Sequence, residues 1–475
     1  LNPYAPGAQI RLIQFGDTQM GWALDWDMWK GLALEVLRSW SGRWIAHNLP
    51  FDQKWVEHHS DFRFPTHLCD DTMLQAHVVN PLGPGGLKPL AGKMIDRRAV
   101  QGEQALHEAM AKNKWTWATV PTDFDSYWIY GALDPVLTSK LDEAFAPKVG
   151  PDGPWRNVYD LEIGVRHVIT RMEQRGARID TDYAATQSAE QIEHANRLLD
   201  WGQTVHGIGL GSNKQLAARF IELGVTFDVF SERTGEPKMD KYQLRILSRH
   251  TDPVVAELAR AVLWMRKARK YGGDYFDKFV RSAVTEDDGQ IIHAQIKSTG
   301  ARTSRMSIGD PPLQQIPKGD ATVRRVFIAR EGNKIIATDY SQIEMRLMAH
   351  FSDDADLQKA FIEADAKGGD FFVGMGREIY QEPDFAKSDP RRSLMKNTLY
   401  GKIYGAGVTK MAETAGVPYG QKEDVVKGIE RRFPGIKMFM KRIEDIGVKR
   451  ERATGQGFVE TPFGRRLPAD NDRLY

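Results

Sequence analysis

Hydrophobic positions divide the chain into an N-terminal part with strands and a longer part dominated by helices. Short apolar runs at Ile10–Phe15, Gly21–Leu24 and Trp44–His47 predict strands, with helical spacing between and after them. From about residue 149 the apolar positions recur at helical spacing, as in Tyr159–Gly176, where Gly176 is suited to end the helix. A further apolar run, Ile335–Ala337, predicts a buried strand with a helix directly after it. The pattern therefore predicts an α/β domain followed by a mainly helical region.

Length and composition limit the class of protein. A chain of 475 residues with 41% hydrophobic and 27% charged residues is expected to form several globular domains. No apolar run approaches the roughly 20 residues of a membrane span, and no signal peptide is visible, so we expect no membrane association. The single cysteine, Cys69, excludes an intramolecular disulfide and suits a reducing, cytoplasmic compartment. Because the net charge is only +2, any affinity for nucleic acid must come from local basic patches.

Two pairs of residues in the N-terminal part have the chemistry of a phosphodiesterase. Asn48 and Asp52 follow the third predicted strand, and Tyr130 and Asp134 lie four residues apart on a predicted helix, Tyr127–Leu141. Carboxylates can hold metal ions and a tyrosine hydroxyl can orient a water molecule. Each pair alone is a weak signal, since both spacings occur by chance.

An aspartate at the end of the last predicted strand is the second candidate. Asp339 closes the run KIIATD at a position where a hard cation such as Mg²⁺ can be held beside phosphate oxygens. The commoner role of a lone aspartate in this position is to cap the next helix.

A helical segment further on, RRSLMKNTLYGKIYG, places two cations and two aromatic rings along one stripe. Arg392, Lys396 and Tyr400 fall four residues apart, and Tyr404 continues the series. The cations can neutralise a triphosphate, and the rings can pack on a sugar and a base. A helix face that only packs in a core would normally be aliphatic, so this composition favours a binding role.

Two helical segments between these sites could contact a polyanion. Ser212 is placed to cap the helix of GSNKQLAARF, leaving backbone amides and Lys214 for a phosphate. The helix around WMRKARK is basic on its polar side, which from charge alone is more often a solvated face.

These segments resemble one protein family. The string DYSQIE-x-R that begins at Asp339 resembles motif A of the family A (polymerase I-like) DNA polymerases, and Arg-x₃-Lys-x₇-Tyr-Gly matches their motif B. The N-terminal motifs, together with DTML, HVVNP and GLKPLA, resemble the 3′–5′ exonuclease domain of the same family. The likeness extends over essentially the whole chain.

The resemblance implies an α/β exonuclease-like domain plus a right-hand polymerase with a helical thumb, a mixed α/β palm and helical fingers. The expected domains are an exonuclease-like domain (1–148), a thumb (149–295), a palm with motif A (296–350), fingers with motif B (351–455) and the start of the return to the palm (456–475). We expect the C-terminal palm to be incomplete, with motif C beyond Tyr475 and the first exonuclease motif before Leu1. Asp25 and Asp27 look similar to that motif but are expected to be surface acids.

The resemblance also assigns roles to residues. Asp339 and the Tyr340 carbonyl would hold two Mg²⁺ ions, and Asp52 and Asp134 would hold two more if the exonuclease site is complete. The nucleotide-binding residues implied are Tyr340, Ser341, Gln342, Tyr400 and Tyr404, with Glu344, Arg392 and Lys396 at the catalytic centre. The DNA-contacting residues implied are Lys214, Arg305, Gln314, Gln315, Arg465 and Arg466.

Some positions depart from the family pattern. Pro312 replaces a usual asparagine, Gln315 often has asparagine in relatives, and Phe372 stands where many relatives have a phosphate-contacting histidine. Tyr400 occupies a position where members have either phenylalanine or tyrosine. Because Phe372 has no group that could bind a phosphate, we expect the contact made by that histidine to be missing here.

The function expected is template-directed DNA synthesis by a phage- or bacterial-type enzyme. Its partners would be primer–template DNA and dNTPs, and we expect a monomer. Two alternatives remain open at this point: a DNA-binding fragment without catalysis, and a stand-alone 3′–5′ nuclease. The segment 296–468 speaks against the nuclease, which has no use for motifs A and B.

Overall fold

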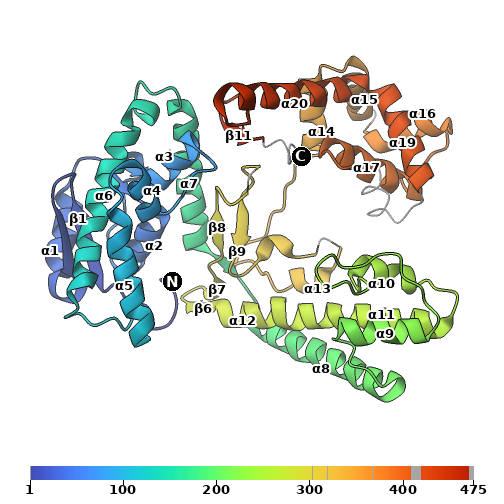
Figure 1. The fold of residues 1–475 in the computed structure, drawn as a ribbon, viewed down its shortest axis with the longest axis horizontal. Coiled ribbons are helices and arrows are strands. Elements are labelled where there is room, and N and C mark those ends of the chain that lie inside the picture. Colours follow the sequence, from blue (N-terminus) through green and yellow to red (C-terminus); the bar gives the residue numbers. More distant parts are fainter. Residues whose placement is uncertain (1, 302, 318, 367, 408–418, 470–475) are drawn as a thin grey trace. The chain divides into compact units, whose positions relative to one another are not determined.

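The computed structural model describes residues 2–301, 303–317, 319–366, 368–407 and 419–469 (Figure 1). The chain divides into two compact units. The first comprises Leu1–Ile335 with Pro462–Arg465, and the second comprises Ile336–Thr461 with Arg466–Tyr475. The end of the expected return to the palm, residues 470–475, lies outside the described residues, as do residues 408–418 within the expected fingers.

The N-terminal part of the first unit is α/β, as predicted. Two strands, β1 (Leu12–Gly16) and β2 (Gly21–Asp25), form an antiparallel hairpin, and β3 (Trp44–Ala46) pairs with β4 (Cys69–Asp71) in parallel. The helices are α1 (Trp26–Ser39), α2 (Leu49–His59), the 3₁₀ turn η1 (Thr66–Leu68), α3 (Thr72–Val79), α4 (Leu87–Met94), α5 (Ala99–Asn113) and α6 (Asp125–Val149).

Close packing joins α6 to the hairpin. Only glycine fits at Gly21, because a Cβ there would lie 1.8 Å from the Ala132 carbonyl oxygen of α6. Asp25 ends β2 and accepts a hydrogen bond from Met28 N, so it caps α1. The predicted third strand ends one residue early, which leaves His47 and Asn48 to lead into α2.

The middle of the chain is mainly helical, as predicted. Gly176 ends α7 with φ 60°, and the Ser212 hydroxyl caps α9 by accepting from Gln215 N. The helices are α7 (Arg156–Arg175), α8 (Thr181–His206), α9 (Asn213–Glu222), α10 (Lys241–Leu247), α11 (Pro253–Arg269), the π-helix η2 (Lys270–Asp277) and α12 (Lys278–Ser282). Helix α8 packs along α11 and η2 (Figure 1).

Short strands follow this helical region. The sheet order is β5–β7–β6, and β8 pairs with β9, all antiparallel. Their bounds are β5 (Ala177–Arg178), β6 (Ala283–Glu286), β7 (Gly289–Ile292), β8 (Gln295–Lys297) and β9 (Ser307–Gly309), and they are followed by η3 (Leu313–Gln315) and α13 (Ala321–Arg324).

The prediction of a buried strand at Ile335–Ala337 is wrong. These residues have no regular secondary structure, and Ile335 and Ile336 are 63% and 85% exposed. A strand requires a neighbouring strand for its backbone hydrogen bonds, and none of the described strands pairs with this run.

The second unit is a helical body with a terminal hairpin. Its elements are α14 (Ile343–Ser352), α15 (Ala355–Ala366), α16 (Phe371–Tyr380), α17 (Pro390–Ile403), α19 (Tyr419–Arg432), α20 (Pro434–Thr454), β10 (Phe458–Glu460) and β11 (Arg466–Pro468). Aromatic and aliphatic side chains from α14 to α20 form one core, with Phe361 and Phe371 stacked at 4.2 Å. No helix in the described part of the chain has the length and apolarity of a membrane span.

Candidate active site

Helix α17 carries three of the predicted residues, Arg392, Lys396 and Tyr400, and a fourth, Tyr404, directly follows it. It begins after Asp389, whose carboxylate accepts a hydrogen bond from Arg391 N. Leu394, Met395, Thr398 and Leu399 are buried, so the helix is anchored through that face. The Lys396 ammonium is exposed and lies 5.9 Å from the centre of the Tyr400 ring. The helix ends at Ile403, so Tyr404 is its C-cap and not a continuation of the stripe.

Arg392 lies in contact with a partner that the sequence pattern did not indicate. Its guanidinium Nε donates to Asp370 Oδ1 at 3.1 Å and Nη2 forms an ion pair with Oδ2. Its Cζ lies 5.8 Å from the centre of the Phe372 ring. Phe372 is buried in the core, so its ring packs against the Arg392 guanidinium and is not exposed to solvent.

Tyr400 connects α17 to the acids of DYSQIE. Burial raises the pKa of Tyr400, and the negative charges of Glu344 and Asp339 raise it further. The two carboxylates therefore lie within electrostatic reach of the tyrosine hydroxyl. The second unit thus brings together Asp339, Glu344, Lys396 and Tyr400, which the sequence places in two separate motifs.

The segment Asp339–Gln342 leads into α14, with Asp339, Tyr340 and Ser341 exposed and a turn at Ser341 and Gln342. Gln342 has a left-handed backbone with φ 53°, and the Ser341 carbonyl accepts a hydrogen bond from Arg346 Nε at 2.9 Å. Arg346 also forms a bidentate ion pair with Asp365, with both distances 2.8 Å. Arg346 is the arginine of DYSQIE-x-R, and its structural role is to fix the turn that presents Tyr340 and Ser341.

The residues expected near the primer end belong to the first unit. Gln314 Nε2 donates to the Met306 carbonyl at 3.1 Å, and Arg305 and Gln315 are exposed. The hydroxyl of buried Tyr275 donates to the Gln315 carbonyl at 2.7 Å. The sequence does not predict this role of Tyr275, because nothing in a helical pattern marks a tyrosine as a support for a distant loop.

Tyr275 belongs to the π-helix η2, which packs closely against α8. The Ser188 hydroxyl of α8 donates to the Gly272 carbonyl at 3.0 Å, which supplies a partner within the widened π turn. A Cβ at Gly272 would lie 2.8 Å from Ile192, so glycine permits the close approach of α8. Tyr271 of the same π-helix donates to Asp320 at 2.9 Å.

The expected basic face near α11 is largely engaged within the protein. Lys267 forms an ion pair with Asp320 at 2.9 Å, and Arg266 donates to the Met239 carbonyl and to Asn213. Lys214 is exposed in the first turn of α9. Near the C-terminal hairpin, Arg465 forms an ion pair with Glu162 and Arg466 Nε lies 3.3 Å from Glu460.

In the N-terminal part, Asp71 organises the second candidate site. Its buried carboxylate accepts hydrogen bonds from Asn48 N at 3.0 Å, Leu49 N at 3.2 Å and Met73 N at 2.9 Å. Asn48 is held in the left-handed region with φ 67°. Asp71 thus fixes the start of α2, and Asp52 follows in its first turn.

The structure brings Asp52 close to Asp134 but adds a cation beside the latter. Desolvation of the Asp52 carboxylate by neighbouring groups raises its pKa to about 7, although part of the residue is exposed, and the charges of Asp71 and Asp134 add to the shift. Asp134 forms an ion pair with Lys88, a residue that is 2% exposed. The Lys88 ammonium also lies 4.5 Å from the ring centre of Tyr130, whose hydroxyl pKa is raised by burial.

The described residues do not by themselves fit two cations at this second site. Within the described ranges, no three or more His, Cys, Asp or Glu side chains form a group suited to a metal ion. The Lys88 ammonium already neutralises Asp134, and Asp52 lies near two further acids. The binding of Mg²⁺ by Asp52 and Asp134 therefore stays a prediction.

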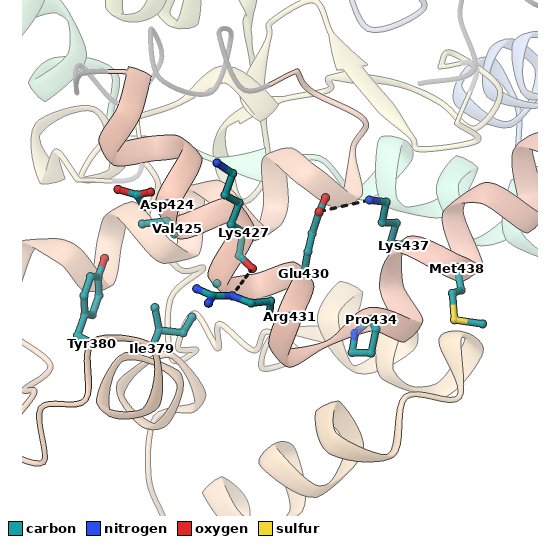
Figure 2. Close-up of a pocket in the computed structure, with 11 residues that line it drawn as sticks. Ile379, Tyr380, Asp424, Val425, Lys427, Glu430, Arg431, Pro434, Lys437 and Met438 are labelled. Atoms are coloured by element: carbon teal, nitrogen blue, oxygen red, sulfur yellow. Dashed lines mark hydrogen bonds and ion pairs between the residues drawn. The ribbon is translucent and has the colours of Figure 1, made fainter.

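A hollow of about 920 Å³ in the second unit lies apart from these residues. Figure 2 shows its lining from α16, α19 and α20, including Ile379, Tyr380 and Met438. Its charged groups are partly paired, with Lys437 Nζ 3.4 Å from Glu430 Oε2 and Arg431 Nε donating to the Lys427 carbonyl. None of the predicted site residues lines it, so its size does not mark the active site.

Comparisons with known proteins identify the family of this chain. The model of DNA polymerase family A matches residues 181–472. The DNA polymerase of Mycobacterium phage D29 is 27% identical over 503 residues, covering 100% of this chain and 78% of the phage protein. DNA polymerase I of Pseudomonas aeruginosa is 32% identical over 406 residues, covering 84% of this chain and 42% of that protein.

A solved structure shares the fold. The polymerase domain of Pol1 from M. smegmatis, in a complex with DNA primer–template and dNTP, matches with a TM-score of 0.72 at 23% identity, covering 94% of this chain and 73% of that chain. The family model covers more than half of the chain and includes every residue of the candidate site in the second unit. This chain therefore belongs to DNA polymerase family A, a family of DNA-directed DNA polymerases, and its likeness to the mycobacteriophage enzymes identifies it as phage-type.

Proposed function

We propose that this protein extends the 3′ end of a DNA primer with dNTPs, copying a template strand. The observation that carries the proposal is the gathering of Asp339, Glu344, Lys396 and Tyr400 in one unit, since it combines acids for metal binding with a cation for phosphate. The complex of the M. smegmatis relative with primer–template and dNTP supports the same ligands here.

The residues suit a phosphoryl transfer in which charge moves from the primer hydroxyl to the leaving pyrophosphate. Arg392 and Lys396 neutralise the triphosphate as its charge shifts. Asp339 and the Tyr340 carbonyl present oxygen donors at the surface, which is the donor chemistry that Mg²⁺ prefers beside substrate phosphates. When bound, Mg²⁺ supplies Lewis-acid stabilisation of phosphate charge. Tyr404 is exposed where it can stack near a base.

We assign the parts of the chain accordingly. The segment 1–148 is exonuclease-like, 149–295 is the thumb, 296–350 belongs to the palm, 351–455 to the fingers, and 456–475 begins the return to the palm. In this assignment Arg305, Gln314 and Gln315 contact the primer–template, supported by the π-helix, and Lys214 contacts the backbone phosphates from α9.

The replacement Asp339→Asn in the full-length protein tests the proposal. We expect it to abolish primer extension and leave the Kd for primer–template within a few-fold of the parent, because the amide keeps the shape but loses the charge. Asp353→Asn is the control, since Asp353 is an exposed aspartate at the other end of α14. Extension near the parental rate by Asp339→Asn would contradict the assignment. A parent that binds primer–template without extending it would favour a DNA-binding protein without catalysis.

A second activity is proposed for the N-terminal part. The exonuclease-like motifs that contain Asp52 and Asp134 motivate 3′–5′ trimming of primer ends as proofreading, with Lys88 already paired to Asp134. Asp52→Ala is expected to abolish trimming of a mismatched 3′ end and leave extension unchanged. If trimming persists in this variant, Asp52 has no part in it and the assignment fails. Trimming without extension in the parent would favour a nuclease.

A further inference from the structure

Two neighbouring arginines at the start of α17 have matched but separate partners. Arg391 pairs with Asp389 at 2.7 Å and with Glu382 at 2.5 Å, and its Cζ lies 4.6 Å from the centre of the Tyr380 ring. Arg392 pairs with Asp370. Asp389 and Asp370 are each the N-cap of a helix, α17 and α16 respectively. An N-cap aspartate therefore pairs with an arginine twice in this unit, at Arg392, which is a predicted triphosphate-binding residue, and at Arg391, which is not.

Asp370 fixes Arg392 through one edge of the guanidinium. Oδ1 of Asp370 accepts from Phe372 N at 3.0 Å, from Val373 N at 3.2 Å and from Arg392 Nε at 3.1 Å, and Oδ2 pairs with Nη2. Burial raises the pKa of Asp370, but the hydrogen bond and charge of Arg392 and the capped amides outweigh it, so the net pKa is lowered. Asp370 is therefore anionic at neutral pH and rigid, because two backbone amides hold it.

The rest of the guanidinium remains available. A guanidinium has five N–H donors in a planar fork, and Asp370 occupies the Nε–Nη2 edge. Arg392 Nη1 makes no hydrogen bond with the residues that the structure describes. The Phe372 ring lies against Arg392 and, at 6.4 Å and 35°, against the Tyr400 ring. Phe372, which replaces the expected histidine, thus supports both candidate nucleotide-binding side chains.

We propose that Asp370 is a positioning residue that orients Arg392 so that its Nη1 side faces the nucleotide triphosphate. This inference rests on the proposed polymerase function. Holding a long side chain before the ligand arrives removes the ordering cost that binding would otherwise include. Phe372 completes the arrangement by preventing the guanidinium from tilting toward the core.

The test compares Asp370→Asn with Asp389→Asn in the full-length protein. Asparagine is as good an N-cap as aspartate, so each variant keeps its cap and loses only the charge that holds its arginine. We expect Asp370→Asn to raise the KM for dNTP about three- to tenfold, the factor for immobilising one long side chain, with a smaller effect on kcat. Asp389→Asn should stay within twofold of the parent.

A second comparison separates positioning from general structural damage. In an Arg392→Ala background, adding Asp370→Asn should not change the KM for dNTP further, because Asp370 acts only through Arg392. Equal effects of Asp370→Asn with and without Arg392 would overturn the inference, as would a lower KM, which would make Asp370 a competing counter-charge. If Arg392→Ala itself leaves the KM unchanged, the role of Arg392 in the proposed function fails. If Arg392→Ala raises the KM and Asp370→Asn does not, only the present inference fails.

Discussion

The ammonium group of Lys88 forms an ion pair with Asp134 in the interior of the N-terminal part. Lys88 is 2% exposed and its Nζ lies 4.5 Å from the centre of the Tyr130 ring. Burial raises the pKa of Asp134, and the Lys88 charge offsets only part of this. A cation of the protein itself therefore stands beside a carboxylate that the family pattern assigns to a metal.

The first prediction concerns the stability of this pair. Lys88→Met leaves Asp134 without a partner and is expected to lower the free energy of unfolding by about 3 kcal/mol, because breaking a buried pair from one side is costly. The double variant Lys88→Met/Asp134→Asn should lose less than the sum of the two single losses. Urea unfolding of the four proteins measures the coupling, with Lys93→Met, an exposed lysine of the same helix, as the control. Additive losses would show that the pair contributes nothing.

The second prediction concerns the π-helix. Tyr275→Phe removes the hydroxyl that donates to the Gln315 carbonyl at 2.7 Å and leaves the packed ring in place. We expect the Kd for primer–template to rise several-fold, with little change in the KM for dNTP, because the loop of Gln314 and Gln315 loses its support. The control is Tyr183→Phe, which removes a similar bond, to the Thr322 carbonyl at 3.1 Å, in the same core. Equal changes in Kd for both variants would mean that the effect is one of general stability.

The third prediction concerns acid stability. Burial lowers the pKa of His77 to about 4, and the charges of Arg465 and Arg166 add to this effect. In the unfolded chain a histidine has a pKa of about 6.5, so between these values the unfolded state binds more protons. The stability that His77 contributes is present above pH 6.5 and is lost as the pH falls to about 4.

His77→Gln should therefore lose less thermal stability than the parent between pH 7 and pH 5. Melting curves at both pH values measure the difference, and His107→Gln, at an exposed position, is the control. A parent and a His77→Gln variant with the same pH dependence would contradict a buried neutral imidazole at this position.

The fourth prediction concerns the sugar of the nucleotide. Glu344 lies in the first turn of α14, and its charge acts on Tyr400. From the resemblance we expect its side chain to occupy the space that a ribose 2′-hydroxyl would need, and an unpaired buried hydroxyl costs about 1–3 kcal/mol. Glu344→Ala should raise the use of rNTPs relative to dNTPs about tenfold in single-nucleotide incorporation. The control, Glu363→Ala on α15, should leave the ratio unchanged. An unchanged ratio in Glu344→Ala would mean that Glu344 has no part in sugar selection.

Local signals allowed much of this fold to be predicted. The spacing of Arg392, Lys396 and Tyr400 gave the helix that became α17, and Gly176 and Ser212 marked the ends of helices correctly. Such features depend on residues within one or two turns of each other, so a single sequence contains them. The α/β character of the first strands was predictable for the same reason.

Other features depend on residues far apart in the chain. The apolar run at Ile335–Ala337 has the composition of a strand, but pairing requires a partner that a local pattern does not identify. Lys88 would ordinarily be placed at the surface, and its burial depends on Asp134 and Tyr130. Nothing local distinguishes Arg391 from Arg392, whose partners are Glu382 and Asp370. The sequence therefore indicates candidate ligand-binding groups, which stay predictions, but not the residues that hold them.

The fifth prediction concerns the hydroxyl of Tyr400 and the 3′-hydroxyl of the nucleotide. A dNTP can donate its 3′-hydroxyl to its own β-phosphate, whereas a ddNTP lacks that bond. The Tyr400 ring lies against Phe372 and next to Lys396 in α17. We expect its hydroxyl to donate to the phosphate in the vacated space. A hydrogen bond to a charged group is worth about 1.5–3 kcal/mol, or about a ten- to hundredfold rate ratio.

We therefore expect the full-length protein to use ddNTPs nearly as well as dNTPs. Tyr400→Phe should restore a preference for dNTPs of about ten- to hundredfold with little change in dNTP use, because the ring and its packing on Phe372 stay. The measurement is the ratio of kcat/KM for each dNTP and its dideoxy analogue, with Tyr380→Phe on α16 as the control, since that ring stacks on Phe385 and contacts Arg391 instead. The same ratio in the parent and in Tyr400→Phe would mean that the Tyr400 hydroxyl does not contact the nucleotide.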